Sequence, residues 1–233
     1  MTATSDQPSA RTQRTLISVD AMGGDQGPAI VVAGCSASAL KNPDISFILH
    51  GPAETLEPLV AKRPELKGRC TIRDAQGVVT MDDKPSNVVR NGKGTSMWSA
   101  IESVRDNEAS VAVSCGNTGA LMALSMIRLK KLPGVTRPAI AVLYPSTNPQ
   151  GFNVLLDVGA DVRADADDLL RYALMGKSYA RNGMDIERPR IGLLNVGTEE
   201  HKGRTELKEA HELIRDAADD AGFEFVGFVE GGD

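Results

Sequence analysis

The chain has 233 residues, of which 41% are hydrophobic and 24% are charged, and its formal net charge is −5 at pH 7. A chain of this length can bury a substantial core, as one large domain or two small ones. The acidic balance excludes a broad basic surface, so we expect no nucleic-acid partner. No run of about 18 apolar residues occurs, and the sequence therefore predicts no membrane-spanning helix.

Cysteine and histidine do not occur in any metal-binding spacing. Their positions are Cys35, Cys70, Cys115, His50, His201 and His211. Neither C-x-x-C nor H-E-x-x-H is present, so we expect no metal site. An odd cysteine count fits a reducing cytoplasm better than a disulfide scaffold. Residues 1–14 are polar and lack the apolar core of a secretion signal, which predicts a disordered tail there.

From residue 15 onward, apolar runs alternate with helical patterns and glycine-bearing turns. In chain order the patterns predict strand 15–20, helix 28–41, strand 45–51, helix 53–62, strand 69–75, helix 95–107, strand 111–114, helix 118–131, strands 138–145 and 153–159, helix 166–180, strand 190–197, helix 205–221 and strand 223–229. Strands that alternate with helices indicate βαβ units. The sequence therefore predicts an α/β fold over residues 15–233, a three-layer αβα sandwich with a mainly parallel sheet.

Several details of this fold can be predicted as well. The strand runs are apolar throughout, which is typical of strands covered on both faces. The segment 118–131 is apolar nearly all round, so we expect a helix buried in the domain or at a subunit contact. Asp165 and Thr205 are the expected N-caps of the last two helices. The stretches 133–134 and 145–151 are the candidate internal boundaries.

In parallel α/β sheets, ligands bind beyond the carboxyl ends of the strands. The first such loop is "DAMGGD", with Asp20, Gly23, Gly24 and Asp25. Its glycines allow a close approach of the backbone to a ligand, and the helix from residue 28 offers N–H groups to an anion. The alternative is a tight turn with Asp20 or Asp25 as a cap. The loop is neither G-x-G-x-x-G nor Walker A, so we expect no nucleotide cofactor.

A second loop, "RNGKGTSM", precedes the predicted helix 95–107. Lys93 stands between two glycines, and Thr95 and Ser96 are at the expected helix start. Flexible backbone, one cation and hydroxyls at a helix N-terminus suit a phosphate group. The alternative is a solvated loop that only caps the helix.

A third loop, "SCGNTGA", follows strand 111–114 and contains Ser114, Cys115, Gly116, Asn117 and Thr118. It poses a choice between a cysteine nucleophile and a cradle for an anion. A nucleophilic Cys115 would need a nearby base, and no histidine lies in an obvious partner context. We therefore expect Cys115 to be a small packing residue under the loop, with Asn117 or Thr118 as the cap of the following helix.

A fourth loop, "LLNVGTEEHKG", holds Asn195, Thr198, Glu199, His201 and Lys202 within eight positions, with Gly197 among them. Polar groups this dense at a strand end indicate a site. The alternative is an ordinary charged surface loop.

In their order and spacing these loops resemble those of the PlsX phosphate acyltransferases of bacterial phospholipid synthesis. The matching stretches are "VDAMGGDQGP", "GKGTSM", "SCGNTGALMAL", "LPGVTRPAIA", "LLDVGADV", "YALMGKSYAR" and "LLNVGTEEHKG". The resemblance runs from about residue 16 to the end of the chain. It departs from the family at Cys115, where alanine is common, and at Gly231–Gly232, where the family has an arginine. The family also continues well beyond residue 233, so we expect a C-terminally shortened chain.

The resemblance implies a fold similar to the isocitrate and isopropylmalate dehydrogenases and to the phosphotransacetylases. It implies that a long acyl chain passes from acyl carrier protein to inorganic phosphate, and that a membrane glycerol-3-phosphate acyltransferase then uses the acyl phosphate. It also implies a cytoplasmic homodimer that associates peripherally with the inner face of the cell membrane, and no cofactor.

This reaction assigns hypothetical roles to the loops, because the protein must orient phosphate beside the thioester and stabilise an oxyanion. Lys202, Asn117 and Asn195 are the expected catalytic residues, with Lys202 neutralising phosphate and Asn117 facing the oxyanion. The expected substrate-binding residues are Asp20, Gly23, Gly24, Asp25, Lys93, Ser114, Gly116, Thr118, Gly197 and Glu199.

Three alternatives stay open at this stage. One is a phosphotransacetylase-like enzyme that uses coenzyme A thioesters. A second is a dehydrogenase of the related fold, which the missing dinucleotide fingerprint disfavours. The third is an inactive scaffold that binds the carrier protein without turnover.

Overall fold

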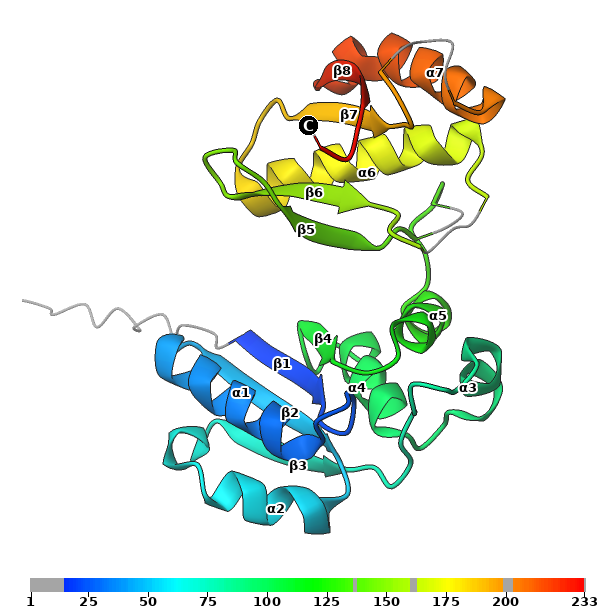
Figure 1. Cartoon of the computed structure of the whole chain (residues 1–233). Coiled ribbons are helices and arrows are strands. Elements are labelled where there is room, and N and C mark those ends of the chain that lie inside the picture. Colours follow the sequence, from blue (N-terminus) through cyan, green and yellow to red (C-terminus); the bar gives the residue numbers. More distant parts are fainter. Residues whose placement is uncertain (1–14, 136–137, 160–162, 199–202, 233) are drawn as a thin grey trace, which may run out of the picture. The chain divides into compact units, whose positions relative to one another are not determined.

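The computed structural model describes residues 15–135, 138–159, 163–198 and 203–232. The chain divides into two compact units, Met1–Lys131 and Leu132–Asp233, which Figure 1 colours from blue to green and from green to red. The dividing point, between Lys131 and Leu132, lies one residue before 133–134, one of the two candidate boundaries. A single domain over residues 15–233 stays a prediction.

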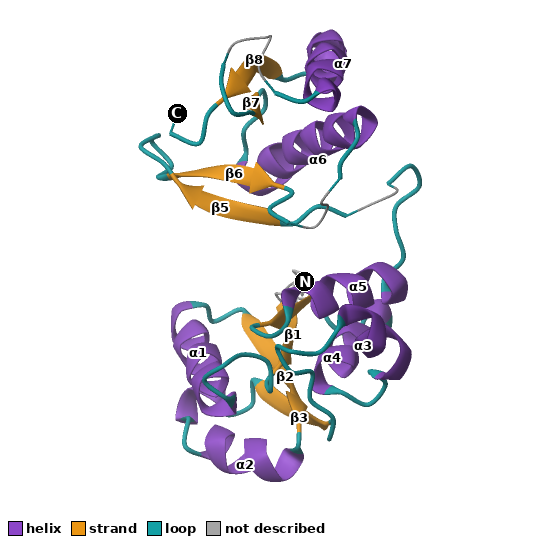
Figure 2. Ribbon diagram, turned by 45° about the vertical axis from the view of Figure 1, so that its right-hand side comes forward, coloured by secondary structure: helices purple, strands orange, loops and turns teal. Residues whose placement is uncertain are grey.

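The first unit is a three-layer sandwich. Its elements are β1 (Thr15–Asp20), α1 (Pro28–Lys41), β2 (Ile45–Gly51), α2 (Ala53–Ala61), the 3-10 turn η1 (Pro64–Leu66), β3 (Cys70–Asp74), α3 (Pro85–Asn91), α4 (Ser96–Arg105), β4 (Val111–Ser114) and α5 (Thr118–Arg128). The strands pair in parallel in the order β3-β2-β1-β4. Figure 2 shows α1 and α2 on one side of this sheet and α4 on the other.

The main core of this unit lies between the sheet and helices α1 and α2. Val19, Phe47 and Leu49 of the strands pack in one buried cluster with Val32 of α1 and Leu56 of α2. Full burial of such a side chain stabilises the fold by about 1.5–3 kcal/mol. These apolar runs fix the strand ends, and so the places where the glycine loops begin.

The second unit contains two small sheets and two long helices. Its elements are β5 (Ala141–Pro145), β6 (Phe152–Leu156), α6 (Ala166–Met184), β7 (Arg190–Leu194), α7 (Thr205–Ala221) and β8 (Glu224–Val229). Strands β7 and β8 pair in parallel, whereas β5 and β6 form an antiparallel pair. Helix α6 packs against α7, β6 and β7, and the core gathers Leu193, Ile214, Phe223 and Phe228.

The predicted α/β architecture, mainly parallel with helices around the sheet, is confirmed. One burial prediction is wrong, and a second holds only in part. Strand β5 is exposed along its whole length, because α6 packs against its partner β6. Helix α5 buries only Ala120 and Leu124, which face α3 and α4, and Ile127 on its other side is 51% exposed. Of the two alternatives for this helix, burial inside the domain is therefore wrong, and a subunit contact stays a prediction. Helix α3 was not predicted, because seven residues are too few for a clear apolar stripe.

Helix capping follows the sequence at three ends and departs from it at one. Thr95, Asn117 and Asp165 each accept a hydrogen bond from the backbone of the helix that they precede. The prediction for Thr205 is wrong, since α7 begins at Thr205 itself and the N-cap position falls on Arg204, which makes no side-chain cap bond. Within the described ranges no helix is long and apolar enough to cross a membrane.

Candidate functional site

The first and third glycine loops lie together at the carboxyl edge of the four-stranded sheet. Strands β1 and β4 are neighbours, with Asp20 in register with Ser114. The Ser114 hydroxyl donates to Asp20 Oδ2 over 2.7 Å, and Gly116 N donates to Ser114 Oγ over 3.1 Å. Met22 N donates to Asp20 Oδ1 over 3.3 Å, so both carboxylate oxygens are engaged within the protein. Asp20 is 2% exposed, and its charge is therefore stabilised by these donors.

Gly23 and Gly24 are glycines because the two loops approach each other closely. A Cβ on Gly23 would lie 2.7 Å from Asp20 Oδ2 and 2.8 Å from both Gly116 N and Ser114 Oγ. Gly24 has φ +102°, and its Cβ would lie 3.2 Å from Cys115 Cβ. The two glycines therefore allow the loop after β1 to lie directly against the loop after β4.

Cys115 does not lie under the loop, and this expectation is wrong. Its side chain is exposed, because Ser114 turns toward Asp20 while Gly116 is buried, which leaves the residue between them facing outward. Thr118, the first residue of α5, is exposed as well.

Asn117 caps α5, as the sequence indicated, and it also bonds to a second loop. Its Oδ1 accepts from Ala120 N over 3.0 Å and so caps α5. Its Nδ2 donates to the carbonyl oxygens of Thr80 and Met81 over 3.1 Å and of Asp83 over 2.9 Å. The side chain is thus engaged at both ends, and it braces residues 80–83 against the start of α5. The sequence analysis did not single out this loop, because its link to Asn117 spans more than thirty positions.

The remaining acidic and basic candidates of the first unit are exposed. Asp25 lies on the β1–α1 loop, and Lys93 lies at the tip of the loop before α4. Behind Lys93 the backbone is fixed by bonds between Gly77 N and Gly94 O and between Ser96 N and Gly77 O. Exposed groups on a fixed backbone are available to a ligand, whereas the buried Asp20 and Asn117 are not free to turn toward one.

In the second unit, Asn195 follows β7 and shapes the loop after it. Its backbone N–H donates to Val229 O over 2.9 Å, and its Nδ2 donates to Gly197 O over 3.0 Å. A Cβ on Gly203 would lie 2.4 Å from Asn195 Oδ1, so Gly203 packs directly on this side chain. Glu199, His201 and Lys202 lie outside the described residues.

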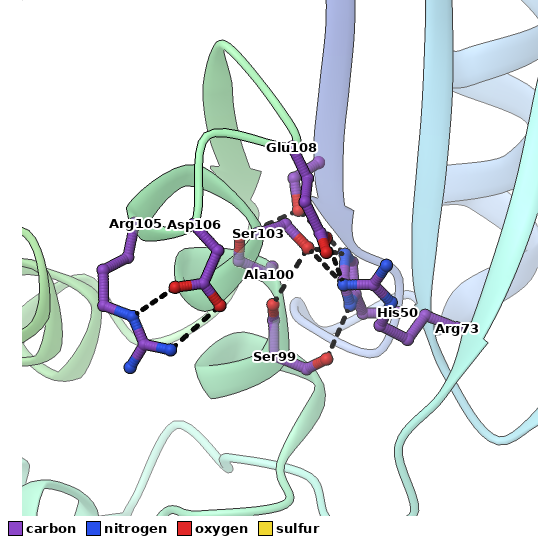
Figure 3. A network of polar contacts seen from close by, with 9 residues as sticks. His50, Arg73, Ser99, Ala100, Ser103, Arg105, Asp106 and Glu108 are labelled. Carbon is purple, nitrogen blue, oxygen red and sulfur yellow. Dashed lines mark hydrogen bonds and ion pairs between the residues drawn. The ribbon is translucent and has the colours of Figure 1, made fainter.

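A buried histidine network was not found by sequence reasoning (Figure 3). His50 of β2 is fully buried, and its ring nitrogens lie 2.8 Å from Ser18 Oγ and 2.8 Å from Ser99 Oγ. Arg73 donates to Ser103 over 2.9 Å and pairs with Glu108. Burial, and then the charge of Arg73, lower the pKa of His50 to about 4.

The His50 ring is therefore neutral at neutral pH, and it fixes α4 on the sheet. The sequence offered no signal for it, because Ser18 lies 32 residues before His50 and Ser99 lies 49 residues after it.

The chain has an α/β fold with two glycine loops at the carboxyl edge of its four-stranded sheet, and this fold is similar to that of the phosphotransacetylases. Its solved neighbours include the EutD phosphotransacetylase from Staphylococcus aureus, with a TM-score of 0.63 at 14% identity, covering 94% of this chain and 69% of that one. A phosphotransacetylase from Streptococcus pyogenes has a TM-score of 0.63 at 18% identity, covering 91% and 67%. At these identities the likeness shows the fold.

The sequence profile of the family described as "Fatty acid synthesis protein" matches residues 15–233, and the chain belongs to this family. A relative from Roseobacter denitrificans named "Phosphate acyltransferase" is 75% identical over 233 residues, which are 100% of this chain and 65% of the relative. One from Paracoccus denitrificans with the same name is 74% identical over 218 residues, 94% of this chain and 59% of the relative. The chain thus spans less than two thirds of the length of these relatives, and the resemblance of its loops is confirmed.

Proposed function

We propose that the protein containing this chain transfers a fatty acyl group from acyl carrier protein to inorganic phosphate and releases acyl phosphate. The observation that carries the proposal is the 75% identity, over all 233 residues, to a relative named "Phosphate acyltransferase". The likeness to phosphotransacetylases supports the fold in which such a reaction would run.

The chemistry requires little covalent help from the protein. A phosphate oxygen attacks the thioester carbonyl carbon, the carbon–sulfur bond breaks, and the carrier thiol leaves with a proton. Phosphate is itself a competent nucleophile, so the protein needs to place it, exclude water and stabilise the oxyanion. Glycine loops, helix N-termini, amides and a lysine suit these tasks.

The exposed residues of the loops are the proposed contacts with substrate. In the first unit these are Asp25, Lys93 and Thr118, with the backbone of Gly23, Gly24 and Gly116 as the surface beneath them. In the second unit Lys202 is proposed to neutralise phosphate and the developing charge, Glu199 to orient that lysine, and Asn195 with Gly197 to hold the loop that carries both.

Asn117 is proposed to act on catalysis by fixing the start of α5, rather than by facing the oxyanion. This revised role is supported by its four internal hydrogen bonds, which a direct contact with substrate would have to break.

The proposal extends to the setting that the family resemblance implies. The protein would act as a cytoplasmic homodimer, associate peripherally with the inner face of the membrane and supply acyl phosphate to a glycerol-3-phosphate acyltransferase.

The test uses the full-length protein and follows release of the carrier thiol with a thiol reagent. We expect release to require phosphate, and acyl carrier protein to be a better donor than coenzyme A. Preference for the coenzyme A thioester would instead favour a phosphotransacetylase-like enzyme, and carrier binding without release would favour a scaffold. Lys202→Ala should lower turnover, whereas Lys62→Ala, at the exposed end of α2, should not. Unchanged turnover in Lys202→Ala would rule out the role given to Lys202.

A further inference from the structure

We infer that Asp20 is a positioning residue: it acts through Ser114 to lock the two glycine loops into one surface, and it does not itself contact phosphate. The inference deepens the proposed function and rests on it. It departs from the interpretation of the sequence alone, in which Asp20 and Ser114 contact substrate.

The direction of the hydrogen-bond chain carries the first step. A carboxylate has no proton to give, so the Ser114 hydroxyl must donate to Asp20 Oδ2 across their 2.7 Å separation. The Ser114 oxygen then accepts from Gly116 N. Asp20 therefore sets the orientation of the Ser114 hydroxyl, and that hydroxyl fixes the Gly116 amide.

The packing around this chain carries the second step. Gly23 lies directly over Asp20 Oδ2, Ser114 Oγ and Gly116 N, all of which a Cβ on Gly23 would meet at less than 3 Å. With Asp20 only 2% exposed, Gly23 covers the carboxylate. A substrate that approached from the side of Gly23 would therefore meet the backbone of Gly23 before Asp20.

Electrostatics carries the third step. Among the described residues Asp20 has no ion-pair partner, and its charge is stabilised by the hydroxyl and the Met22 amide. A phosphate in direct contact would bring like charges together in a poorly solvated place, which disfavours binding. A buried carboxylate beneath an anion-binding surface is better explained by the loop geometry that it holds.

The experiment compares Asp20→Ala, Ser114→Ala and the double variant in the full-length protein. We measure kcat, KM for phosphate and the hydrogen-exchange rate of the Gly116 amide. Asp44→Ala, at an exposed carboxylate between α1 and β2, is the matched control. Removing a hydrogen bond to a charged group is expected to raise KM for phosphate about 10-fold or more in each single variant, and to speed Gly116 exchange.

The double variant should be no worse than the more damaged single variant, because both substitutions break the same chain. Ser114→Thr, which keeps the hydroxyl, should restore most of the phosphate affinity. Since Ser114 is only half-buried, KM for phosphate and Gly116 exchange in Ser114→Ala test the inference if Asp20→Ala fails to fold.

Two results would overturn the inference. One is an unchanged KM for phosphate in folded Ser114→Ala. The other is additive losses with an unchanged Gly116 exchange rate, as expected of two direct phosphate ligands. Failure of the proposed function is distinguishable, because the wild type would then release no thiol in the presence of phosphate, while Gly116 exchange would still report the link between Asp20 and Ser114.

Discussion

The ring of His50 donates to Ser18, and not the reverse. The Ser18 hydroxyl has one proton, which it gives to the carbonyl oxygen of Ala100 over 2.8 Å. The 2.8 Å bond between His50 Nε2 and Ser18 Oγ therefore needs its proton from the ring. A neutral ring with its proton on Nε2 accepts from Ser99 at Nδ1, so the network assigns both the tautomer and the charge of His50.

This network predicts an acid-sensitive first unit. The pKa of His50 is lowered to about 4 by burial and by Arg73, against a partial opposing effect of Glu108, and an unfolded histidine titrates near 6.5. Between these values the unfolded chain binds the proton and the folded chain does not. Stability is therefore lost as pH falls from about 6.5 to about 4, by about 3 kcal/mol in total.

Urea unfolding at several pH values, followed by the fluorescence of Trp98, tests this. Trp98 is the single tryptophan and lies on α4 beside the network. Because carboxylates also titrate near pH 4, the wild type is compared with His50→Gln, which removes the titrating group. The variant should show the shallower dependence on pH, and parallel curves would contradict the prediction.

We expect the Asn117 side chain to contribute more to stability through the hydrogen bonds that its Nδ2 donates than through the capping bond that its Oδ1 accepts. Asn117→Asp keeps the acceptor for Ala120 N but turns a carboxylate oxygen toward three carbonyl oxygens. We expect a loss of about 2–3 kcal/mol in the free energy of unfolding, and a smaller loss for Asn117→Ser, which removes the donor without repulsion. Asn87→Asp on the exposed face of α3 is the control. If Asn117→Asp unfolds at the same urea concentration as this control, the brace contributes nothing.

Gly23 and Gly34 should respond to alanine in opposite directions. Alanine at Gly23 meets the backbone nitrogen of Gly116 at 2.8 Å, and the strain should cost about 1–3 kcal/mol. Gly34 is an exposed position within α1, where a Cβ meets nothing within 4 Å, so Gly34→Ala should stabilise by up to about 1 kcal/mol. Thermal unfolding of the two variants measures the difference. Equal melting temperatures would mean that the loops can separate without cost.

The two long helices of the second unit offer a matched pair of capping tests. Asp165 accepts from Asp168 N over 2.8 Å, and Asp165→Ala should cost about 1 kcal/mol. Thr205 caps nothing, so Thr205→Ala should change stability by less than about 0.5 kcal/mol. Hydrogen exchange of the first-turn amides of each helix is the measurement. If the first-turn amides of α7 exchanged faster in Thr205→Ala, Thr205 would cap α7 after all, and this prediction would be wrong.

Local signals in the sequence were sufficient for most of the fold. The runs of β1 and β2 are apolar and end in glycine-bearing turns, so their bounds could be placed from the sequence. The exposure of β5 could not be predicted, because it depends on where α6 packs. Helix α3 is too short for its period to stand out.

In the candidate site, too, some features could be predicted from the sequence and others could not. Strand-end loops were predicted from the rule for parallel sheets, and two of them do lie together at β1 and β4. The roles within the loops depend on partners far along the chain. Asn117 bonds to residues 80–83, and Asp20 bonds to Ser114, 94 positions away. Such long-range pairings cannot be predicted from the composition of the chain or from the spacing of its motifs.

The pairing of Asp20 with Ser114 also bears on how the sheet finds its alignment. A parallel strand that slips by one residue turns every side chain to the opposite face. In that alignment Asp20 would lose the Ser114 hydroxyl and be buried without its donor, at a cost of several kcal/mol. The contact between Asp20 and Ser114 thus penalises a misaligned pairing of β1 and β4 during folding. The same hydrogen bond therefore specifies both the conformation of the two loops and the register of the two strands.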